Sequence, residues 1–503
     1  MKSLAVKILM LVLLITTVLI LKAVNHASTQ LPVAGITPMP LDNQIILPRL
    51  QQALQIETIS YDDSRQFNLD KFTALHRHIF GSFPNIANQL EVEIVNQMSL
   101  LFFWQGTDPT LKPIALLGRL DVVPTQSADL KRWIAKPFSD SIVTQRIYGR
   151  GTMDDKGASM STLEAVELLL VAGFKPQRSI YIAFGHDAEV GGNAGASAVA
   201  EILKQRRVQL EFVLNEGGAI MSGAIPGISN KTAMIGVAEK GYLSLQLSVE
   251  TNSGHSSQPP AETAIGILSR ALVQIEDNPF PTRLTDPVRL NLEYLAAELS
   301  APIKLVVTNL WLFKSLLLAV FDRDQSLIPF IRTTGVITIF NSGVKDNVIP
   351  GSAQATINTR ILPGETRQSV HARMVELVDD ERVQINQIVQ GSRDPSPVSD
   401  HMAVGFQLIQ KTVGKTFNKP NATVYATPYL LMGDTDWRHY ADLTKNIYRF
   451  SPLDMQADEM SSLHGVNESI RVDNYLDMIR FYYRFINNLN LYDDSATERL
   501  GGG

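Results

Sequence analysis

Between about residues 114 and 220, short apolar runs alternate with segments of helical periodicity. The runs IALLGRLDVV, SIYIAFGHDAE and LEFVLNEGG are separated by ASMSTLEAVELLLVAGF and GASAVAEILKQR. Continuous apolar strands of this kind are typical of a parallel sheet that helices cover on both faces. The pattern therefore predicts a βαβαβ arrangement and the α/β fold class, with a site at the carboxyl ends of the strands.

The pattern changes near residue 240. The stretches YLSLQLSVET (242–251) and SAQATINTRI (352–361) alternate strictly between apolar and polar positions, as half-buried antiparallel strands do. Helical periodicity returns after about residue 364. We therefore expect an α+β domain over 240–363 that is inserted between two parts of a larger α/β domain, 49–239 and 364–492.

The N-terminal segment is strongly hydrophobic. Lys2 and Lys7 precede the run ILMLVLLITTVLIL (8–21), and Lys22 follows it. This length suits a signal-peptide core, whereas residues 4–24 together approach the roughly 20 that span a bilayer. We interpret residues 1–27 as a signal peptide or a membrane anchor, and the poor cleavage site before Ala27 favours the anchor. The rest of the chain is expected to be exported to an extracellular, periplasmic or lumenal compartment.

Three other segments stand out by composition. The proline-rich residues 28–48 predict an irregular linker, and the polar tail 493–503 predicts disorder. The apolar stretch IKLVVTNLWLFKSLLLAVF (303–321) contains Lys304 and Lys314, which a membrane span tolerates poorly. We expect this stretch to form a buried or groove-lining helix.

Overall composition narrows the range of functions. The 503 residues include 45 basic and 50 acidic side chains, for a net charge of −5, and this balance argues against a nucleic-acid partner. The chain has no cysteine, so any metal ion must be held by His, Asp and Glu. Acidic residues follow the predicted strands as Asp187 with Glu189 and as Glu216, which comes after Asn215.

Seven stretches resemble, in the same order, the motifs of the co-catalytic zinc metallopeptidases and amidohydrolases, the family of carboxypeptidase S and aminoacylase. They are LLGRLDVVP, WIAKPF, YGRGTMDDKG, GHDAEVGG, NEGG, SGHSSQPP and HGVNE. The elements AEKG, WLF, NVIP, RILPG and TDWR are similar to those of the N-fatty-acyl-amino-acid synthase/hydrolase branch. The resemblance covers about residues 50–490. It implies that 49–239 and 364–492 form a zinc-peptidase-like catalytic domain, and that 240–363 form a lid or dimerisation domain.

The resemblance also implies a site for two zinc ions. By position, Asp154 matches the aspartate that bridges both ions, Glu189 and His464 match the other ligands of one zinc, and Glu216 matches a ligand of the second. Two such ions activate a water molecule for hydrolysis of an amide bond. The implied substrate is an N-acyl amino acid or a peptide with a free carboxylate. Without the resemblance, Asp154 would be interpreted as a helix N-cap and His464 as an ordinary loop residue.

Two positions depart from the family pattern. Arg119 stands where the family has a zinc-ligand histidine, and a guanidinium has no lone pair to donate. Ala188 stands where the family has the glutamate that acts as general base. Loss of a general acid/base typically removes a factor of about 10² to 10⁴ in rate. We therefore expect one zinc or none, impaired catalysis, and no replacement by Asp187, whose side chain should point to the opposite face.

The Arg119 substitution suggests a physical hypothesis. Its guanidinium is expected to occupy the vacated zinc position and to pair with Asp154 and Glu216 by charge-assisted hydrogen bonds. Asp121 resembles the residue that orients the missing histidine, so we expect it to pair with Arg119 or with another cation. Trp437, in place of a family serine, is expected either to narrow the pocket or to pack in the core.

The lid domain contributes three further candidates. Asn347 and Arg360 resemble the residues that hold a substrate carboxylate, which suits a guanidinium. His255 resembles the lid histidine that reaches the partner's site in dimeric relatives and stabilises the oxyanion, so a homodimer through the lid is expected. The alternatives are a surface charge for Arg360 and turn capping for His255.

The sequence is compatible with three functions. The first is an active hydrolase that uses one zinc, the second is a pseudoenzyme that binds an acyl amino acid without cleaving it, and the third is a dimer partner of an active paralogue. Because Arg119 and Ala188 both affect the reaction itself, we favour a family amidohydrolase scaffold whose catalysis is impaired or lost.

Overall fold

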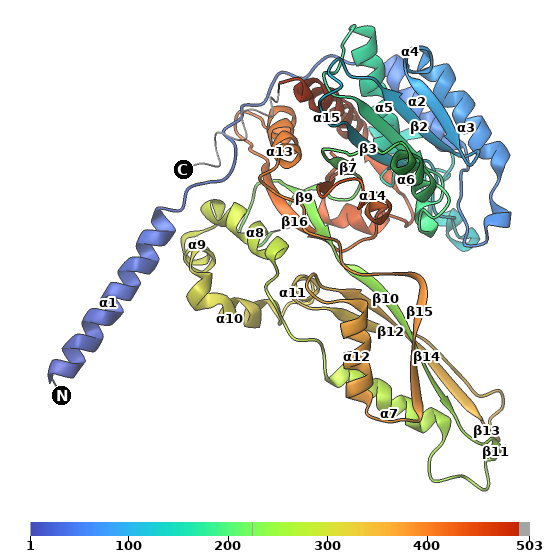
Figure 1. Cartoon of the computed structure of the whole chain (residues 1–503), viewed down its shortest axis with the longest axis vertical. Coiled ribbons are helices and arrows are strands. Elements are labelled where there is room, and N and C mark those ends of the chain that lie inside the picture. The colour runs from blue at the N-terminus through green and yellow to red at the C-terminus, as the bar shows by residue number, and fades with distance from the viewer. Residues whose placement is uncertain (1, 224, 492–503) are drawn as a thin grey trace.

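The computed structural model describes residues 2–223 and 225–491. It contains a large α/β domain, a second sheet that extends from it, and a long N-terminal helix that projects away from both (Figure 1). The tail 493–503, for which the sequence predicts disorder, lies outside the described residues.

A ten-stranded sheet in the order β1-β2-β6-β3-β7-β17-β9-β8-β18, with β16 paired to β9, forms the centre of the α/β domain. Strands β6, β3, β7 and β17 are parallel to one another, whereas β1 and β2 are antiparallel additions at one edge. The predicted βαβαβ arrangement and the α/β class are confirmed. The strands are β1 (Glu91–Val95), β2 (Ser99–Trp104), β3 (Ile114–Arg119), β6 (Ile180–Gly185), β7 (Val213–Asn215), β8 (Ile220–Met221), β9 (Thr232–Glu239), β16 (Tyr425–Leu431), β17 (Ile447–Arg449) and β18 (Asp454–Met455).

Helices bury both faces of this sheet. Ile114 and Leu116 of β3 pack in one apolar cluster, while Ala115 between them packs in another, as alternation along a strand requires. The first face is covered by α2 (Asn43–Gln55), α3 (Leu69–Ser82), α4 (Pro84–Gln89), α5 (Lys156–Val171), α13 (Val404–Phe417) and α15 (Val472–Leu489), and the second by α6 (Ala196–Gln205) and α14 (Trp437–Tyr440). A small sheet and short 3₁₀ helices complete the domain: β4 (Ile142–Val143), β5 (Arg146–Tyr148), β19 (Ser469–Arg471), η1 (Ser64–Gln66), η2 (Ser127–Arg132), η3 (Ala188–Val190) and η5 (Ala457–Ser462).

The second sheet is antiparallel and four-stranded, in the order β12-β14-β10-β15. Leu243, Leu245 and Leu247 of β10 and Ala355 and Ile357 of β14 are buried on its inner face, as the strict alternation of both segments predicts. Its strands are β10 (Gly241–Glu250), β12 (Thr334–Ser342), β14 (Ser352–Ile361) and β15 (Val383–Arg393), and the helices α7 (Ala264–Asp277) and α12 (Arg367–Val378) pack on it. Strands β11 (Gly254–His255) and β13 (Val348–Ile349) form a separate two-stranded sheet.

The expected boundary of the inserted domain at residue 363 differs from the structure in two ways. Strand β15 pairs with β10, with Ile385 opposite Leu247, and α12 packs on the same sheet, so this unit extends to Arg393. Conversely, residues 286–331 pack against the first domain. They form α8 (Asp286–Leu295), η4 (Ala296–Glu298), α9 (Ala301–Thr308), α10 (Leu310–Phe321) and α11 (Ile328–Ile331). Helical periodicity does not tell which sheet a helix covers, so it did not locate this boundary.

Two smaller expectations also need correction. The single helix expected over 303–321 is interrupted at Asn309, where α9 and α10 meet in a bend of 115°. The linker expected over 28–48 ends earlier, because α2 begins at Asn43 with Asp42 as its N-cap and includes Pro48. The proline had favoured irregular structure, because it lies beyond the first turn and has no backbone N–H to donate. Burial of Ile46, Leu50, Ala53 and Leu54 on one face stabilises the helix nevertheless.

Helix α1 (Lys2–Val24) is exposed along most of its length. Within residues 2–223 and 225–491, its segment Ser3–Val24 is the single helix long and apolar enough to cross a membrane, unless the bent pair α9–α10 is counted as one broken span. Its length and composition suit a signal sequence or an anchor.

Candidate metal centre and active site

The carboxyl ends of β3, β6 and β7 meet at one edge of the central sheet, and a cluster of charged side chains lies there. Arg119 is the last residue of β3, and its side chain is 9% exposed. Its Nη2 contacts Asp154 Oδ1 and lies 3.2 Å from Glu216 Oε2, and its Nη1 lies 3.4 Å from Glu189 Oε2. The pairing with Asp154 and Glu216 that the sequence suggests is present, and Glu189 is a third partner.

His464 closes the cluster on its more exposed side. Its Nε2 lies 2.8 Å from Asp154 Oδ2 and 3.3 Å from Glu189 Oε1. Asp154, Glu189 and His464 each offer one ligand atom, and these three atoms lie within 4.8 Å of one another. One imidazole nitrogen and two carboxylate oxygens form a donor set that zinc accepts.

The same cluster does not offer a second complete set of ligands. Glu216 and Asp154 point toward the remaining position, but Arg119 fills the place of the expected histidine and already contacts both carboxylates. A guanidinium cannot coordinate a cation and repels one. The residues therefore fit one zinc ion at Asp154, Glu189 and His464, in competition with Arg119, and they do not fit two.

Burial and charge act in opposite directions in this cluster. Burial by itself would lower the pKa of Arg119, but Glu189 and Glu216 raise it, so the guanidinium stays charged. Burial raises the pKa of Glu216 well above its usual value despite the nearby arginine. For Glu189, burial raises the pKa but Arg119 and His464 lower it, and the net shift is downward. Burial also raises the pKa of Asp155, beneath the cluster, to about 7.

A buried ion pair positions the loop that carries Asp154. Glu468 accepts hydrogen bonds from the backbone N–H groups of Gly151 and Met153, each at 2.9 Å, and its other oxygen lies 2.5 Å from Arg150 Nη1. Both partners are almost fully buried. Arg150 also donates to the carbonyl oxygen of His464 at 3.0 Å. The motifs YGRGTMDDKG and HGVNE are therefore held together by this pair.

Asp121 is fully buried but is not oriented as the sequence suggested. Its carboxylate accepts hydrogen bonds from Ser60 Oγ at 2.7 Å and from the backbone N–H groups of Ala188 and Glu189 at 3.2 and 3.0 Å. Burial raises its pKa to about 6. The expected pairing with Arg119 is replaced by these contacts, which fix the backbone that presents Glu189.

Ala188 lies in η3 with no side chain beyond its methyl group, so the position for which the resemblance implies a general base offers no proton acceptor in this chain. Asp187 does not replace it, since its carboxylate accepts from the backbone N–H groups of Ala194 and Gly195 at 2.7 and 2.8 Å. Trp437 packs in the core with 7% exposure, and its Nε1 donates to Glu239 Oε1 at 3.1 Å. Of the two expectations for Trp437, packing is the one observed.

The three lid candidates do not gather at the cluster. His255 in β11 and Asn347 just before β13 lie at the end of the second sheet that points away from the first domain (Figure 1). His255 Nδ1 accepts from Ser257 N at 3.1 Å, which fits the turn-capping alternative. Arg360 lies at the other end of β14, opposite Tyr242, whose ring centroid is 4.8 Å from the guanidinium. Among the described residues, Arg360 Nη1 is buried without a hydrogen-bond acceptor.

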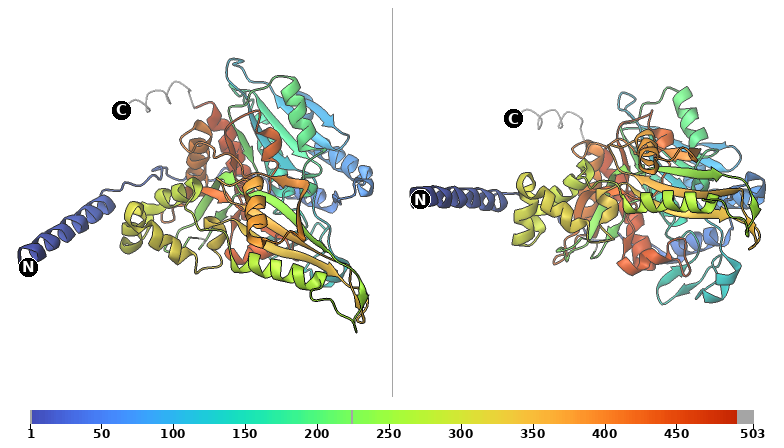
Figure 2. Two further views of the ribbon diagram at one scale, coloured as in Figure 1. Left: turned by 60° about the horizontal axis from the view of Figure 1, so that its bottom comes forward. Right: turned by 90° about the horizontal axis from the view of Figure 1, so that it is seen from below.

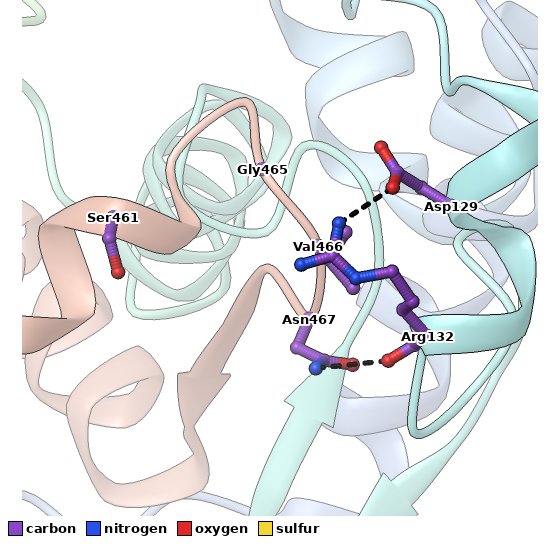
Figure 3. Close-up of a pocket in the computed structure, with 6 residues that line it drawn as sticks. All are labelled: Asp129, Arg132, Ser461, Gly465, Val466 and Asn467. Atoms are coloured by element: carbon purple, nitrogen blue, oxygen red, sulfur yellow. Dashed lines mark hydrogen bonds and ion pairs between the residues drawn. The ribbon is translucent and has the colours of Figure 1, made fainter.

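A polar cavity of about 530 Å³ lies beside the His464 loop (Figure 3). The motifs WIAKPF and HGVNE meet at its wall, because Asn467 Oδ1 accepts from the backbone N–H of Ile134 at 2.6 Å. At the same wall, Arg132 pairs with Asp129 at 2.8 Å. The lining residues are Asp129, Arg132, Ser461, Gly465, Val466 and Asn467.

Comparison with known proteins gives the family. The model of peptidase family M20/M25/M40 matches residues 115–488, so the chain belongs to this family. The resemblance of the seven motifs is thereby confirmed. Members of this family are metal-dependent hydrolases of peptide and related amide bonds, and the fold and the acidic cluster described above are consistent with that class.

Individual relatives extend this likeness over most of the chain. The chain is 38% identical over 488 residues to the probable carboxypeptidase S-like 2 of Dictyostelium discoideum, covering 95% of this chain and 92% of the relative. It is 40% identical over 450 residues to the N-fatty-acyl-amino acid synthase/hydrolase PM20D1 of Mus musculus, covering 88% of each. Among solved structures, the M20 family metallo-carboxypeptidase Sso-CP2 of Sulfolobus solfataricus shares the fold with a TM-score of 0.66 at 16% identity, over 90% of this chain and 100% of that one.

Sequence reasoning missed some of the residues that build the site. Asp155 and Glu468 are buried, and they lie inside the motifs YGRGTMDDKG and HGVNE, respectively. Their place in these motifs is the sequence signal that could have marked them as part of the site. Ser60, which donates to Asp121, lies in a loop with no motif around it. No local pattern in the sequence indicates that contact.

Proposed function

We propose that this chain is an M20-family amidohydrolase scaffold that binds an N-acyl amino acid, or a peptide with a free carboxylate, and hydrolyses its amide bond slowly or not at all. One observation carries the proposal. The Arg119 guanidinium lies among Asp154, Glu189 and Glu216, in the space between carboxylates that a metal ion would otherwise bridge. The chain itself thus supplies the cation of this position.

A guanidinium does not supply the chemistry of zinc. It compensates part of the negative charge of the carboxylates, but it cannot coordinate a water molecule and lower its pKa as zinc does. Proton transfer is lost as well, because Ala188 has no basic atom and the nearby carboxylates of Asp121 and Asp187 are held by backbone N–H groups. Loss of the general base alone lowers a rate by about 10² to 10⁴.

Substrate binding has stronger support than catalysis. Arg360 Nη1 is buried and has no acceptor among the described residues, so a substrate carboxylate would satisfy it by a charge-assisted hydrogen bond. Asn347 lies far from Arg360 within one chain, at the other end of the second sheet. Both residues can serve one site only if the lid of a second copy approaches. We therefore infer a homodimer through the lid, in which His255 and Asn347 face the partner's site.

A second candidate function has its own observation. Asp154, Glu189 and His464 form a three-ligand group that fits one zinc. When bound there, zinc would polarise the amide carbonyl and activate water. Arg119 would then stabilise negative charge on the oxyanion. This candidate is a hydrolase with one zinc and a basic group other than that of its relatives.

The test compares binding with turnover in the same samples. The full chain in detergent is prepared with saturating zinc and, separately, after chelation, and a panel of N-acyl amino acids is followed by calorimetry and by chromatography of the free amino acid. The proposal expects saturable binding and the same low turnover in both samples. Zinc-dependent turnover would support the second candidate instead. The absence of both binding and turnover would contradict both candidates.

A further inference from the structure

Helix α1 ends against the bend between α9 and α10. Leu19 and Ala23 of α1 are buried, whereas most of the earlier residues of the helix are exposed. At the bend, Asn309 is fully buried, and its Nδ2 donates to the carbonyl oxygen of Leu19 at 3.2 Å. Both further views also show α1 leaving the body of the protein beside these helices (Figure 2). The bend is therefore fixed at a defined level along α1.

That level places α9 and α10 at the edge of the membrane that α1 can cross. The apolar segment of α1 runs from Ser3 to Val24, and Leu19 lies one to two turns before its end. A rise of 1.5 Å per residue puts the bend about 7 Å inside the end of the segment. Helices that lie in the membrane interface bury their apolar face to about this depth, roughly 5–10 Å.

The outer surface of α10 has the composition of an interfacial helix. Leu312, Leu316 and Val320 repeat every four residues and are exposed by 46, 55 and 54%, while Leu317 faces the body of the protein and is buried. Trp311 is 65% exposed. Tryptophan is enriched at membrane interfaces. Lys22 lies near the end of α1, Lys304 lies in α9, Lys314 lies in α10, and Arg323 follows α10 between Asp322 and Asp324. Basic residues in these segments suit contact with anionic headgroups.

A large apolar cavity lies behind this surface. Its volume is about 710 Å³, within the range of ligand pockets. Leu317 of α10 lines one side together with Leu316 and Val320, which are also exposed, so the cavity opens toward the surface that carries them. Met460, four residues before His464 of the acidic cluster, lines another side. The cavity thus has one wall on the exposed helix and another on the segment that leads to His464. Its predominantly aliphatic lining suits a hydrocarbon chain.

We propose that α9 and α10 dock in the interface of the bilayer that α1 crosses, and that the cavity behind them receives the hydrocarbon chain of a single-chain amphiphile from that bilayer. The docking follows from the contact with α1 and from the exposed surface of α10. The identification of the chain as the acyl part of an N-acyl amino acid rests on the proposed function. The bilayer is thus both the partner of the α10 surface and the source of the ligand.

Trp311 is a built-in probe for the docking. The other tryptophans, Trp104, Trp133 and Trp437, are at most 9% exposed, so a quencher in the lipid reports mainly on α10. The full chain, with α1 verified by intact mass, is placed in nanodiscs whose lipids are brominated either near the headgroup or near the chain end. We expect strong quenching by the shallow label, weaker quenching by the deep one, and loss of both effects in Trp311→Phe.

Two results would overturn the docking. If iodide in the water quenches Trp311 fully in the nanodiscs and neither brominated lipid does, α10 faces solvent. If neither iodide nor the brominated lipids quench Trp311, and the protein is a dimer in solution that Leu316→Lys dissociates, the surface binds a second copy instead. Removal of α1 from the purified protein, seen in the intact mass, would also contradict the proposal.

The cavity is tested separately with a fatty acid that carries a photoreactive group at its chain end. After irradiation in nanodiscs, peptide mapping is expected to find the label on α9, α10 and the Met460 segment. Leu317→Trp fills the cavity and should abolish this labelling, whereas Leu312→Trp adds the same ring on the outer surface and should leave it unchanged. Labelling that neither substitution changes would overturn the cavity assignment. Labelling of the cavity without binding of any N-acyl amino acid would reject the proposed function and leave this inference standing.

Discussion

Arg119 Nη2 lies 3.2 Å from Glu216 Oε2, so that a side-chain cation rather than an exchangeable ion faces this buried carboxylate. The same nitrogen also contacts Asp154. A covalently attached cation cannot be removed by a chelator, and it keeps the acidic residues paired when no metal is bound. The acidic cluster can therefore remain folded, with part of its negative charge compensated, without carrying out the chemistry for which a metal is needed.

The first prediction concerns zinc stoichiometry. The unmodified chain is expected to bind at most one zinc ion per chain after dialysis, because one set of three ligands is complete. Arg119→His restores a ligand and removes the competing charge, so it should bind a second ion. His464→Ala, in the unmodified background, should abolish binding. Elemental analysis by mass spectrometry measures all three, and two ions per unmodified chain would contradict the account.

The second prediction concerns stability. Replacing Arg119 by Met leaves three buried carboxylates without their cation, and removing one partner of a buried ion pair costs about 3–5 kcal/mol. We expect a comparable loss in the free energy of unfolding, measured by urea denaturation in detergent. The matched control is Arg206→Met, because Arg206 and Glu93 form an exposed pair that contributes roughly 0–1 kcal/mol. Equal losses for the two variants would argue against a structural role for Arg119.

The third prediction concerns recognition of the carboxylate. Arg360→Lys keeps the charge but loses the planar geometry of the guanidinium. We expect it to weaken binding of an N-acyl amino acid by about tenfold, and Arg360→Met by more, since a charge-assisted hydrogen bond contributes about 1.5–3 kcal/mol. The matching amide, which has no carboxylate, should bind all three proteins equally weakly. Calorimetric titration of both ligands provides the test, and equal losses for acid and amide would show that Arg360 does not contact the carboxylate.

The fourth prediction concerns pH. Burial lowers the pKa of Lys240 to about 7, while its usual value is 10.5. Between these values the unfolded chain holds a proton that the folded chain does not, so this group makes the protein more stable as pH rises from 7 to 10.5. The stability of the unmodified chain relative to Lys240→Met should therefore increase by up to about 1.4 kcal/mol per pH unit. Denaturation at several pH values checks this, and a difference that is flat or falls with pH would refute it.

Much of the site was predictable because its residues lie in short motifs at the ends of strands. Glu189 and Glu216 follow from the rule that parallel strands end at one edge of a sheet, whereas Asp154 was identified through the family resemblance. The pairing of Arg119 follows from charge. What local patterns did not contain is the contact between distant segments. Ser60 donates to Asp121 across 61 positions of the chain, and such a contact leaves no periodic signal.

The domain boundary was missed for a related reason. Residues 364–378 have the same helical periodicity whether they cover the first sheet or the second, and pairing of β15 with β10 decides between them. Asn309 illustrates the opposite case. An asparagine within an apolar stretch is only a modest signal for a break in a helix. Its side chain nevertheless donates a hydrogen bond to the carbonyl oxygen of Leu19 in α1, at the bend between α9 and α10.

The most direct test of the central claim is hydrolysis of a panel of N-acyl amino acids at saturating zinc by the full chain and by its Arg119→His, Ala188→Glu double variant. The account predicts turnover in the double variant and a rate at least about 10²-fold lower in the unmodified chain, the minimum expected from loss of a general base. Comparable rates in the two proteins would contradict it, because Arg119 would then be compatible with catalysis and a base other than residue 188 would have to act.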